Sequence, residues 1–322
     1  MKMKKNILGV DIGGTKCAVI YGQKEGDTLH LVEKVKFPTT SVDETIANIC
    51  SEIEQMMGRH GLDSSNTGAI GISCGGPLDS KRGVVMSPPN LPGWNDIPIV
   101  RMLEERFGIR TGIHNDANAC ALAEWKFGAG VGTQNMVFLT FGTGLGAGLI
   151  LDGKLYAGTN DNAGELGHIR LSEFGPVGYG KCGSFEGFAS GGGIAQLARF
   201  KVSEKQQMGE SVAWCPPGQL DSISAHTVAL AAASGDPLAL EIYRISATYL
   251  GRGLAMVIDL LNPEVIVIGS IYARNENLMK PYTEEVIARE ALSHARRVCR
   301  VVPAALGEAI GDYAALSVAA NA

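Results

Sequence analysis

The stretch Asp11-Ile12-Gly13-Gly14-Thr15-Lys16 lies between two apolar runs, residues 7–10 and 17–21. Both runs have the length and residue types of buried strands, so we predict a turn that joins two strands rather than a strand and a helix. Glycine permits positive φ and close backbone approach, and Thr15 and Lys16 can donate hydrogen bonds to oxygens. Asp11 suits a hydrated Mg²⁺ better than a bare phosphate, which it would repel. The stretch therefore predicts a site for a metal-bound polyphosphate, with an ordinary β-hairpin as the alternative.

A second glycine and threonine turn repeats this pattern. The apolar run 136–140 precedes Phe141-Gly142-Thr143-Gly144-Leu145-Gly146, and the apolar run 147–151 follows it. Two phosphate hairpins in one chain indicate two lobes that clasp one nucleotide.

The second turn also fits the loose dinucleotide pattern Gly142-x-Gly144-x-x-Ala147, so a Rossmann enzyme is a rival interpretation. That fingerprint needs a helix directly after the loop to receive the pyrophosphate. Here a short apolar run ends at the turn Asp152-Gly153, which favours a hairpin. A Walker loop is excluded, because no Gly-Lys-Ser or Gly-Lys-Thr occurs.

Composition limits the classes of partner. With 322 residues, 45% of them hydrophobic, the chain can build two medium domains with a ligand cleft between them. The net charge of −5 and the lack of a long Lys/Arg block argue against nucleic-acid binding and favour a small molecule. Asp11 and Lys16 interrupt the apolar segment that a signal peptide would need, and no apolar run is long enough for a bilayer, so we expect a cytoplasmic protein. The seven cysteines contain no Cys-x-x-Cys pair and are expected to be reduced.

The order of predicted elements indicates an α/β fold of two related lobes. A strand over 111–114 and a helix over 117–127 place Asn115 and Asp116 at the carboxyl edge of a sheet, where such folds bind ligands. A strand over 265–268 meets the turn Gly269-Ser270, whose backbone could approach a flat ring. Helices are expected from Ser41 to Gly58, from Pro98 to Gly108, and over 192–200, 225–234, 237–262 and 311–321. We place the N-terminal lobe at residues 1–115, with an amphipathic C-terminal helix (308–322) packed back on it, and the C-terminal lobe at 116–307.

Five motifs occur in the order and spacing found in the ROK family of sugar kinases, which the chain resembles over nearly its whole length. They are Asp11-Ile-Gly-Gly-Thr-Lys16, Pro89-Asn90-Leu91-Pro92-Gly93-Trp94, Asn115-Asp116-Ala117-Asn118-Ala119, Phe141-Gly-Thr-Gly-Leu-Gly146 and Gly164-Glu165-Leu166-Gly167-His168. The resemblance implies a two-lobed actin-like and hexokinase-like ATPase fold, built from duplicated ribonuclease H-like domains, with ATP and sugar in the cleft between the lobes.

The resemblance also implies roles for single residues. Asp116 aligns with the general base, and the alternative for this residue is an N-cap of the following helix. A carboxylate can take the proton of a sugar hydroxyl as it attacks the γ-phosphoryl group. The resemblance implies that Asp11 holds Mg²⁺ through water. The residues implied to face the phosphates, the adenosine and Mg²⁺ are Asp11, Gly13, Gly14, Thr15, Lys16, Thr143, Gly144, Gly269 and Ser270. The residues implied to contact the sugar are Gly76, Asn90, Asn115, Asp116, Glu165, His168 and Glu186.

The chain departs from the family at a zinc site. Many members hold zinc with the histidine after Glu-x-Gly and three cysteines, whose positions here carry Val177, Tyr179 and Ser184, with Cys182 out of register. One thiolate and one imidazole do not complete a tetrahedral site, so we expect no structural zinc and a loop 169–185 held by packing and hydrogen bonds.

The implied function is ATP-dependent phosphorylation of a hydroxyl, O6 in the glucokinase manner, on a hexose or N-acylhexosamine. The alternative is a sugar-sensing ROK protein without catalysis that acts through a protein partner; another ATPase of the same fold class is a further one. The family's repressors carry a DNA-binding domain before the kinase-like body. Because the first core strand is expected from about residue 6, we expect no such domain here. The resemblance suggests a homodimer.

Overall fold

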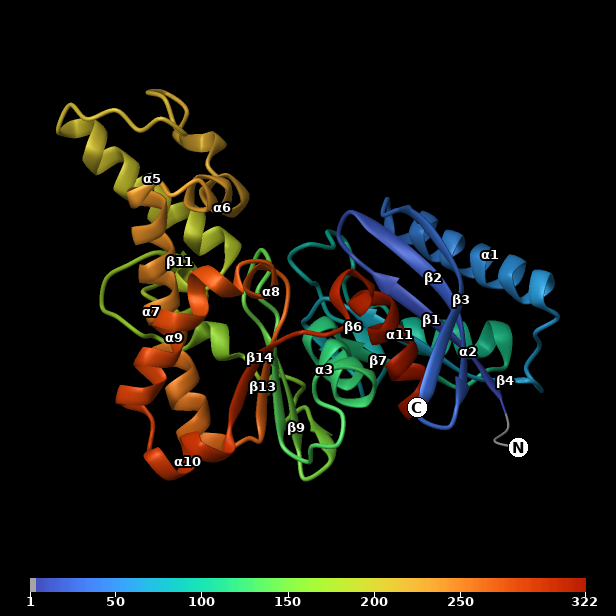
Figure 1. Ribbon diagram of the computed structural model, residues 1–322. Helices are drawn as coiled ribbons and strands as arrows, with labels where there is room; N and C mark the ends of the chain where they lie inside the picture. The colour runs from blue at the N-terminus through green and yellow to red at the C-terminus, as the bar shows by residue number, and fades with distance from the viewer. Residues whose placement is uncertain (1–3) are drawn as a thin grey trace. The chain divides into compact units, whose positions relative to one another are not determined.

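The computed structural model describes residues 4–322 (Figure 1). The chain divides into two compact units, each of mixed helices and sheet. The first unit contains residues 1–134, 148–163 and 305–322, and the second contains 135–147 and 164–304. The first unit is therefore built from three separate stretches of the chain.

The first unit is organised around a five-stranded sheet with the strand order β3-β2-β1-β4-β7. The bounds are β1 Lys5–Ile12, β2 Lys16–Glu25, β3 Thr28–Pro38, β4 Thr67–Cys74 and β7 Thr111–Asn115. β1, β2 and β3 form an antiparallel meander, while β4 and β7 lie parallel to β1. The predicted turn between two strands is confirmed, because Ile12 pairs with Cys17 across it.

One face of this sheet is covered by α1 (Val42–His60) and α2 (Ile99–Phe107). The Ser41 hydroxyl caps α1 by accepting the Glu44 N–H at 3.4 Å, and Gly61 ends the helix in the left-handed conformation. Apolar side chains of α1, such as Ile49 and Ile53, are fully buried against the strands. A two-stranded hairpin, β5 (Leu78–Asp79) and β6 (Val84–Val85), lies in the long segment between β4 and α2.

The opposite face is covered by α11 (Ile310–Asn321), which also packs against α3 (Asp116–Phe127). We expected an amphipathic helix here, and that detail is wrong. Every residue from Ala314 to Ala319 is buried, because the helix lies between a sheet and another helix and has two covered sides. Small residues allow this close approach: a Cβ on Gly71 would clash with the backbone of Ala315 and Ala319.

The second unit has three parallel strands, β8 (Met136–Leu139), β13 (Val265–Ile268) and β14 (Arg300–Pro303). They belong to a second sheet of order β10-β9-β8-β13-β14, in which β9 (Ala147–Leu151) and β10 (Lys154–Tyr156) form a hairpin that, from Gly148 on, belongs to the first unit. Asp152 and Gly153 turn this hairpin with φ of 50° and 69°. No helix follows the second glycine turn directly, which excludes the Rossmann interpretation.

Helices make up most of the rest of the second unit. They are α4 (Phe185–Phe188), α5 (Gly191–Gln207), α6 (Ala225–Ala233), α7 (Pro237–Leu261), α8 (Ile271–Arg274), α9 (Glu276–Glu290) and α10 (Ser293–Val298). The expected helix over 237–262 is confirmed: Asp236 caps α7 by accepting the Ala239 N–H at 2.9 Å, and Asn262 ends it in the left-handed conformation. The expected helix at 192–200 is seven residues longer at its end, so α5 extends to Gln207. Among residues 4–322 no helix is both long and apolar enough to cross a membrane.

Candidate functional site

In the first unit, the carboxyl ends of three parallel strands bring the predicted residues together. Ile12 of β1 pairs with Cys74 of β4, which pairs with Asn115 of β7. One position earlier, Asp11, Ser73 and His114 form the adjacent row. Asp11 and the Asn115-Asp116 pair are therefore held at one sheet edge, two strands apart.

The first glycine turn is closed by its own backbone and by the end of β3. The Gly13 N–H donates to the Lys16 carbonyl at 3.2 Å, and the Thr39 hydroxyl donates to the Gly13 carbonyl at 2.6 Å. Gly14, Thr15 and Lys16 are exposed, so their polar groups are accessible to a ligand.

Asn90 lies against this turn. A Cβ on Gly14 would clash with the Asn90 carbonyl oxygen, and one on Gly75 would lie 3.2 Å from the Asn90 amide oxygen. Gly76, the next residue, faces Asn115: its Cβ would lie 4.0 Å from the Asn115 Cβ. The structure therefore brings the expected phosphate turn and four expected sugar contacts, Gly76, Asn90, Asn115 and Asp116, into one region of the first unit.

Asn115, rather than Asp116, caps α3. The Asn115 carboxamide oxygen accepts the Asn118 N–H at 2.7 Å, while Asp116 is the first helical residue and accepts the Ala117 N–H at 2.8 Å. The interpretation of Asp116 as the N-cap is wrong. Asp116 retains exposed surface, yet the surrounding protein raises its carboxyl pKa by desolvation, which the two backbone N–H groups only partly offset.

Asp11 is the second carboxylate of this region. Burial raises its pKa to about 6; Lys34 lowers it, and Asp312 and Asp116 raise it further. Lys34 is ion-paired with Asp312 at the start of α11. A carboxylate oxygen is a ligand that Mg²⁺ prefers, and a cation beside Asp11 would offset the desolvation of its charge.

In the second unit, the second glycine turn is joined to the N-terminus of α5. The Gly191 N–H donates to the Gly142 carbonyl at 2.8 Å, and the Gly192 N–H donates to the Thr143 carbonyl at 3.2 Å. Within the turn, the Thr140 hydroxyl accepts the Gly146 N–H at 2.8 Å. Thr143 itself is exposed.

A pocket of about 480 Å³ opens beside this turn. Thr143 and Ser270, both expected to contact nucleotide, line it, and Gly269 is buried just before Ser270. Ser270 has a φ of 51° and accepts a hydrogen bond from the Arg274 guanidinium at 3.0 Å. No sequence motif predicted several of the other lining residues, which are Ala195, Ile223, Ser224, His226, Ile271 and Arg274. They come from three separate segments of the chain.

The remaining expected sugar contacts also lie in the second unit. Glu165 directly precedes the short 3₁₀ helix Leu166–His168, whose last residue is His168, and both side chains are exposed. Glu186, on α4, is engaged elsewhere: its carboxylate accepts the Leu145 N–H of the second glycine turn at 2.9 Å. A Cβ on Gly144 would lie 2.5 Å from the same carboxylate oxygen. Glu186 therefore connects the end of loop 169–185 to the second glycine turn.

Loop 169–185 is held by hydrogen bonds around a small hairpin, β11 (Val177–Gly178) and β12 (Lys181–Cys182). The Gln196 carboxamide bonds both the N–H and the carbonyl of Val177, at 2.9 and 2.8 Å. The Lys181 ammonium donates to the His168 carbonyl at 2.7 Å. Within residues 4–322 no group of three His, Cys, Asp or Glu side chains could hold a metal ion.

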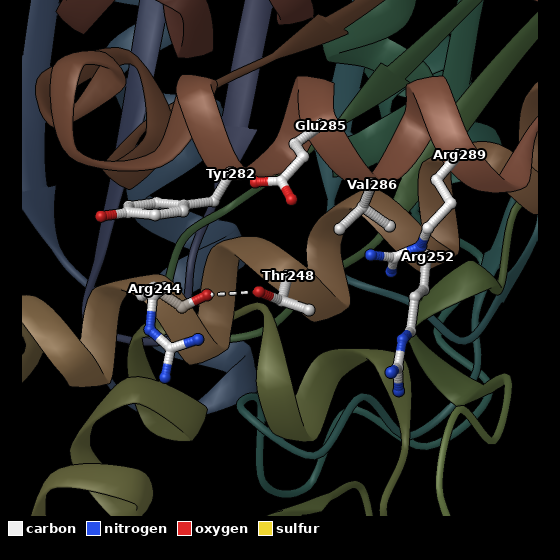
Figure 2. Close-up of a pocket in the computed structure, with 7 residues that line it drawn as sticks. All are labelled: Arg244, Thr248, Arg252, Tyr282, Glu285, Val286 and Arg289. Carbon is white, nitrogen blue, oxygen red and sulfur yellow. Dashed lines mark hydrogen bonds between the residues drawn. The ribbon is translucent and has the colours of Figure 1, made fainter.

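A further pocket of about 350 Å³ lies between α7 and α9 and contains none of the expected site residues (Figure 2). Arg244 and Arg252 extend from different turns of α7, with Thr248 between them, and Arg289 comes from α9. Because the guanidinium groups of Arg244 and Arg252 lie at opposite ends of the pocket, they do not converge on one ligand group.

Two α/β units, each with a glycine turn after its first parallel strand, define a mixed α/β protein of the hexokinase-like class. The family model described as "ROK family" matches residues 7–321, and the chain belongs to the ROK family. A glucokinase of Streptomyces coelicolor is 33% identical over 314 residues, 97% of this chain and 96% of the relative.

Solved structures agree with this assignment. A ROK family glucokinase from Streptomyces griseus, in complex with glucose and AMPPNP, superposes with a TM-score of 0.76 at 30% identity and covers 98% of this chain and 100% of its own. A ROK family transcriptional regulator, a homologue of the Escherichia coli MLC protein, has a TM-score of 0.84 at 27% identity, covering 99% of this chain and 78% of its own. Because these glucokinases match most of its length, the chain is a sugar kinase.

Proposed function

We propose that the protein transfers the γ-phosphoryl group of Mg-ATP to O6 of a hexose or N-acylhexosamine, with Asp116 as the general base. The observation that carries this proposal is that Asn115 and Asp116 have different roles at the start of α3. Asn115 satisfies the helix N-terminus, so Asp116 is not needed as a cap. Its raised pKa suits a group that must take up a proton near neutral pH.

The first unit would supply the phosphate turn and the sugar contacts. Asp116 accepts the proton of the attacking hydroxyl while Asn90 and Asn115 orient the sugar. Lys16 and the N–H groups of the first turn neutralise charge on the transferred group. Mg²⁺, held by Asp11 through water, would supply further charge neutralisation on the phosphates.

The second unit would bind the nucleotide. The pocket beside Thr143 and Ser270 has the volume of a small-molecule site, and the N-terminus of α5 opens into it. The glucose and AMPPNP in the Streptomyces griseus relative support ATP and a hexose as the substrates. Glu165 and His168 of the second unit are proposed as further sugar contacts.

The test is ADP release from Mg-ATP against a panel of hexoses and N-acylhexosamines, with Asp116→Asn beside the parent protein. We expect turnover with one sugar and a loss of about 10²–10⁴-fold in kcat in the variant, with the sugar Kd nearly unchanged, because a general base contributes about that much. Asn115→Ala is not a suitable control, because it removes the cap of α3. Lys36→Gln, an exposed substitution on β3, is the control variant.

Two other outcomes are informative. Sugar binding without turnover in the parent would overturn the catalytic proposal and favour the sugar sensor, a role that the MLC-like relative makes worth testing. ATP hydrolysis that no sugar stimulates would indicate an ATPase instead. We also propose that the protein is a homodimer, which light scattering tests. We propose that it does not bind nucleic acid, which electrophoretic mobility with DNA tests. The proposed lobe limits are 1–115 with 308–322 for the N-terminal lobe and 116–307 for the C-terminal lobe.

A further inference from the structure

The first unit has a cavity that is lined by none of the residues to which a role is assigned above. Its volume is about 390 Å³, and it is bounded by β7, α3, the β9–β10 hairpin and the end of α11. The residues that line it are His114, Leu122, Trp125, Lys126, Gly153, Lys154, Leu155, Ala157 and Asn321. A cavity of this size exceeds what a single ion fills and falls in the range of small-molecule sites.

One residue that lines the cavity has an unsatisfied polar atom. The Nδ1 atom of His114 is buried and has no hydrogen-bond partner in the described part of the chain. Buried polar atoms without a partner are rare and point to a missing ligand or water. Burial lowers the pKa of His114, with Asp161 opposing, so the ring is neutral near pH 7 and one tautomer places a donor at Nδ1.

The charges around the cavity are mainly positive. Lys126 and Lys154 line it, and none of its lining residues is acidic. The Lys126 ammonium lies 3.4 Å from the Trp125 ring centre, and the indole N–H is already used by the Thr133 carbonyl. Desolvation lowers the pKa of Lys126, and repulsion from Lys24 lowers it further, whereas attraction to Asp27 raises it. A bound anion would relieve both effects.

We propose that this cavity is a binding site for a small phosphate monoester, with the phosphoryl group held by Lys126, Lys154 and the His114 ring and the organic part packed on Leu122 and Leu155. Two ammonium groups and one ring N–H match the several oxygens of a phosphate better than a single carboxylate. The ligand would touch β7 and α3, the two elements that meet at Asn115 and Asp116.

Calorimetric titration of the full chain with glycerol 3-phosphate tests this proposal, with glycerol as the uncharged counterpart. The double variant Lys126→Gln/Lys154→Gln should weaken binding about tenfold or more, because hydrogen bonds between charged groups are lost. Lys36→Gln removes one exposed charge at the opposite edge of the same sheet and should leave Kd unchanged. Both lysines of the double variant are exposed, so its fold is expected to survive.

A second readout locates the ligand. In long-range ¹H–¹⁵N spectra of the histidine rings, glycerol 3-phosphate should shift the His114 signals of the parent and not those of the exposed His30. Binding that the double variant retains in full, with unmoved His114 signals, would place the ester at the glycine turns and overturn the proposal. Glycerol binding as tightly as its phosphate, or no binding to the parent, would do so as well. None of these measurements depends on kinase turnover, so the proposed function can fail separately.

Discussion

At the scale of single residues, the burial of the Asp11 carboxyl group has a consequence for stability. Asp11 has a folded-state pKa of about 6 against 3.8 for the free group. Its ionisation is therefore more costly in the folded state, and stability is lost as pH rises from about 4 to 6 and stays lower above that range.

We expect Asp11→Asn to raise the free energy of unfolding at pH 7.5, on the order of 1 kcal/mol once solvent screening is allowed for, while abolishing turnover. Urea denaturation at pH 7.5 and 5.0 checks the sign, because the gain should be smaller at pH 5.0. A variant less stable than the parent at pH 7.5 would mean that the Lys34 and Lys16 charges outweigh burial.

Glu186 is the residue whose environment departs most from its expected role as a sugar contact. Because its carboxylate accepts the Leu145 N–H, we expect Glu186→Ala to lower kcat/KM for ATP by about 10–100-fold, the effect of leaving that N–H unpaired. Glu186→Gln keeps an acceptor oxygen and should lose much less. Steady-state kinetics with ATP varied at saturating sugar, and with sugar varied at saturating ATP, separates the two. Equal losses in both variants, expressed in the sugar KM, would support direct sugar contact instead.

At the scale of elements, the close packing of α11 on β4 predicts opposite effects for two glycines. Gly71→Ala should destabilise the fold by about 1–3 kcal/mol, because its Cβ meets the backbone of α11. Gly58→Ala, inside α1 with no atom within 4 Å of the new Cβ, should stabilise it by about 0.5–1 kcal/mol. Thermal unfolding of both variants measures this; a Gly71→Ala protein as stable as the parent would show that α11 can move away.

Elements with local signals could be predicted from the sequence, and those set by tertiary packing could not. Both glycine hairpins, and α7 with its Asp236 and Pro237 start, follow from turn chemistry and capping. The burial of α11 on two sides depends on a sheet formed some 240 residues earlier in the chain, which periodicity does not encode. The length of α5 was missed for a related reason: its last turns carry polar residues, and no glycine or proline breaks them before Gly209.

The candidate site also contains residues that the sequence could predict and residues that it could not. Asp11, Asn90 and Asp116 lie in contiguous motifs that carry their chemistry, so the sequence could identify them as candidates. His226 and Arg274 reach the pocket beside Thr143 and Ser270 from α6 and α8, far from any such motif, and only the folded second unit brings them together. The hydrogen bond between Glu186 and Leu145 likewise joins residues that no spacing rule connects.

At the scale of the whole molecule, the proposed function assigns the pocket for the nucleotide to the second unit and most of the sugar contacts to the first. Hydrogen exchange should show that AMPPNP protects backbone amides at 142–144, 191–195 and 224–226, while glucose protects 88–92 and 114–118. Amides in the middle of α1 serve as the internal control. Nucleotide protection confined to the pocket of Figure 2, between α7 and α9, would contradict the assignment.

The discontinuity of the first unit has a consequence for biosynthesis. Its sheet is translated before the second unit, whereas the covering helix α11 and the segment 305–306, whose N–H groups bond the buried Glu124 carboxylate, are translated after it. At about 5–20 residues per second, one face of that sheet waits on the order of ten seconds for its cover. During that interval the nascent chain exposes Ile7, Ile20 and Ala69, so we expect it to bind chaperones until α11 has left the ribosome.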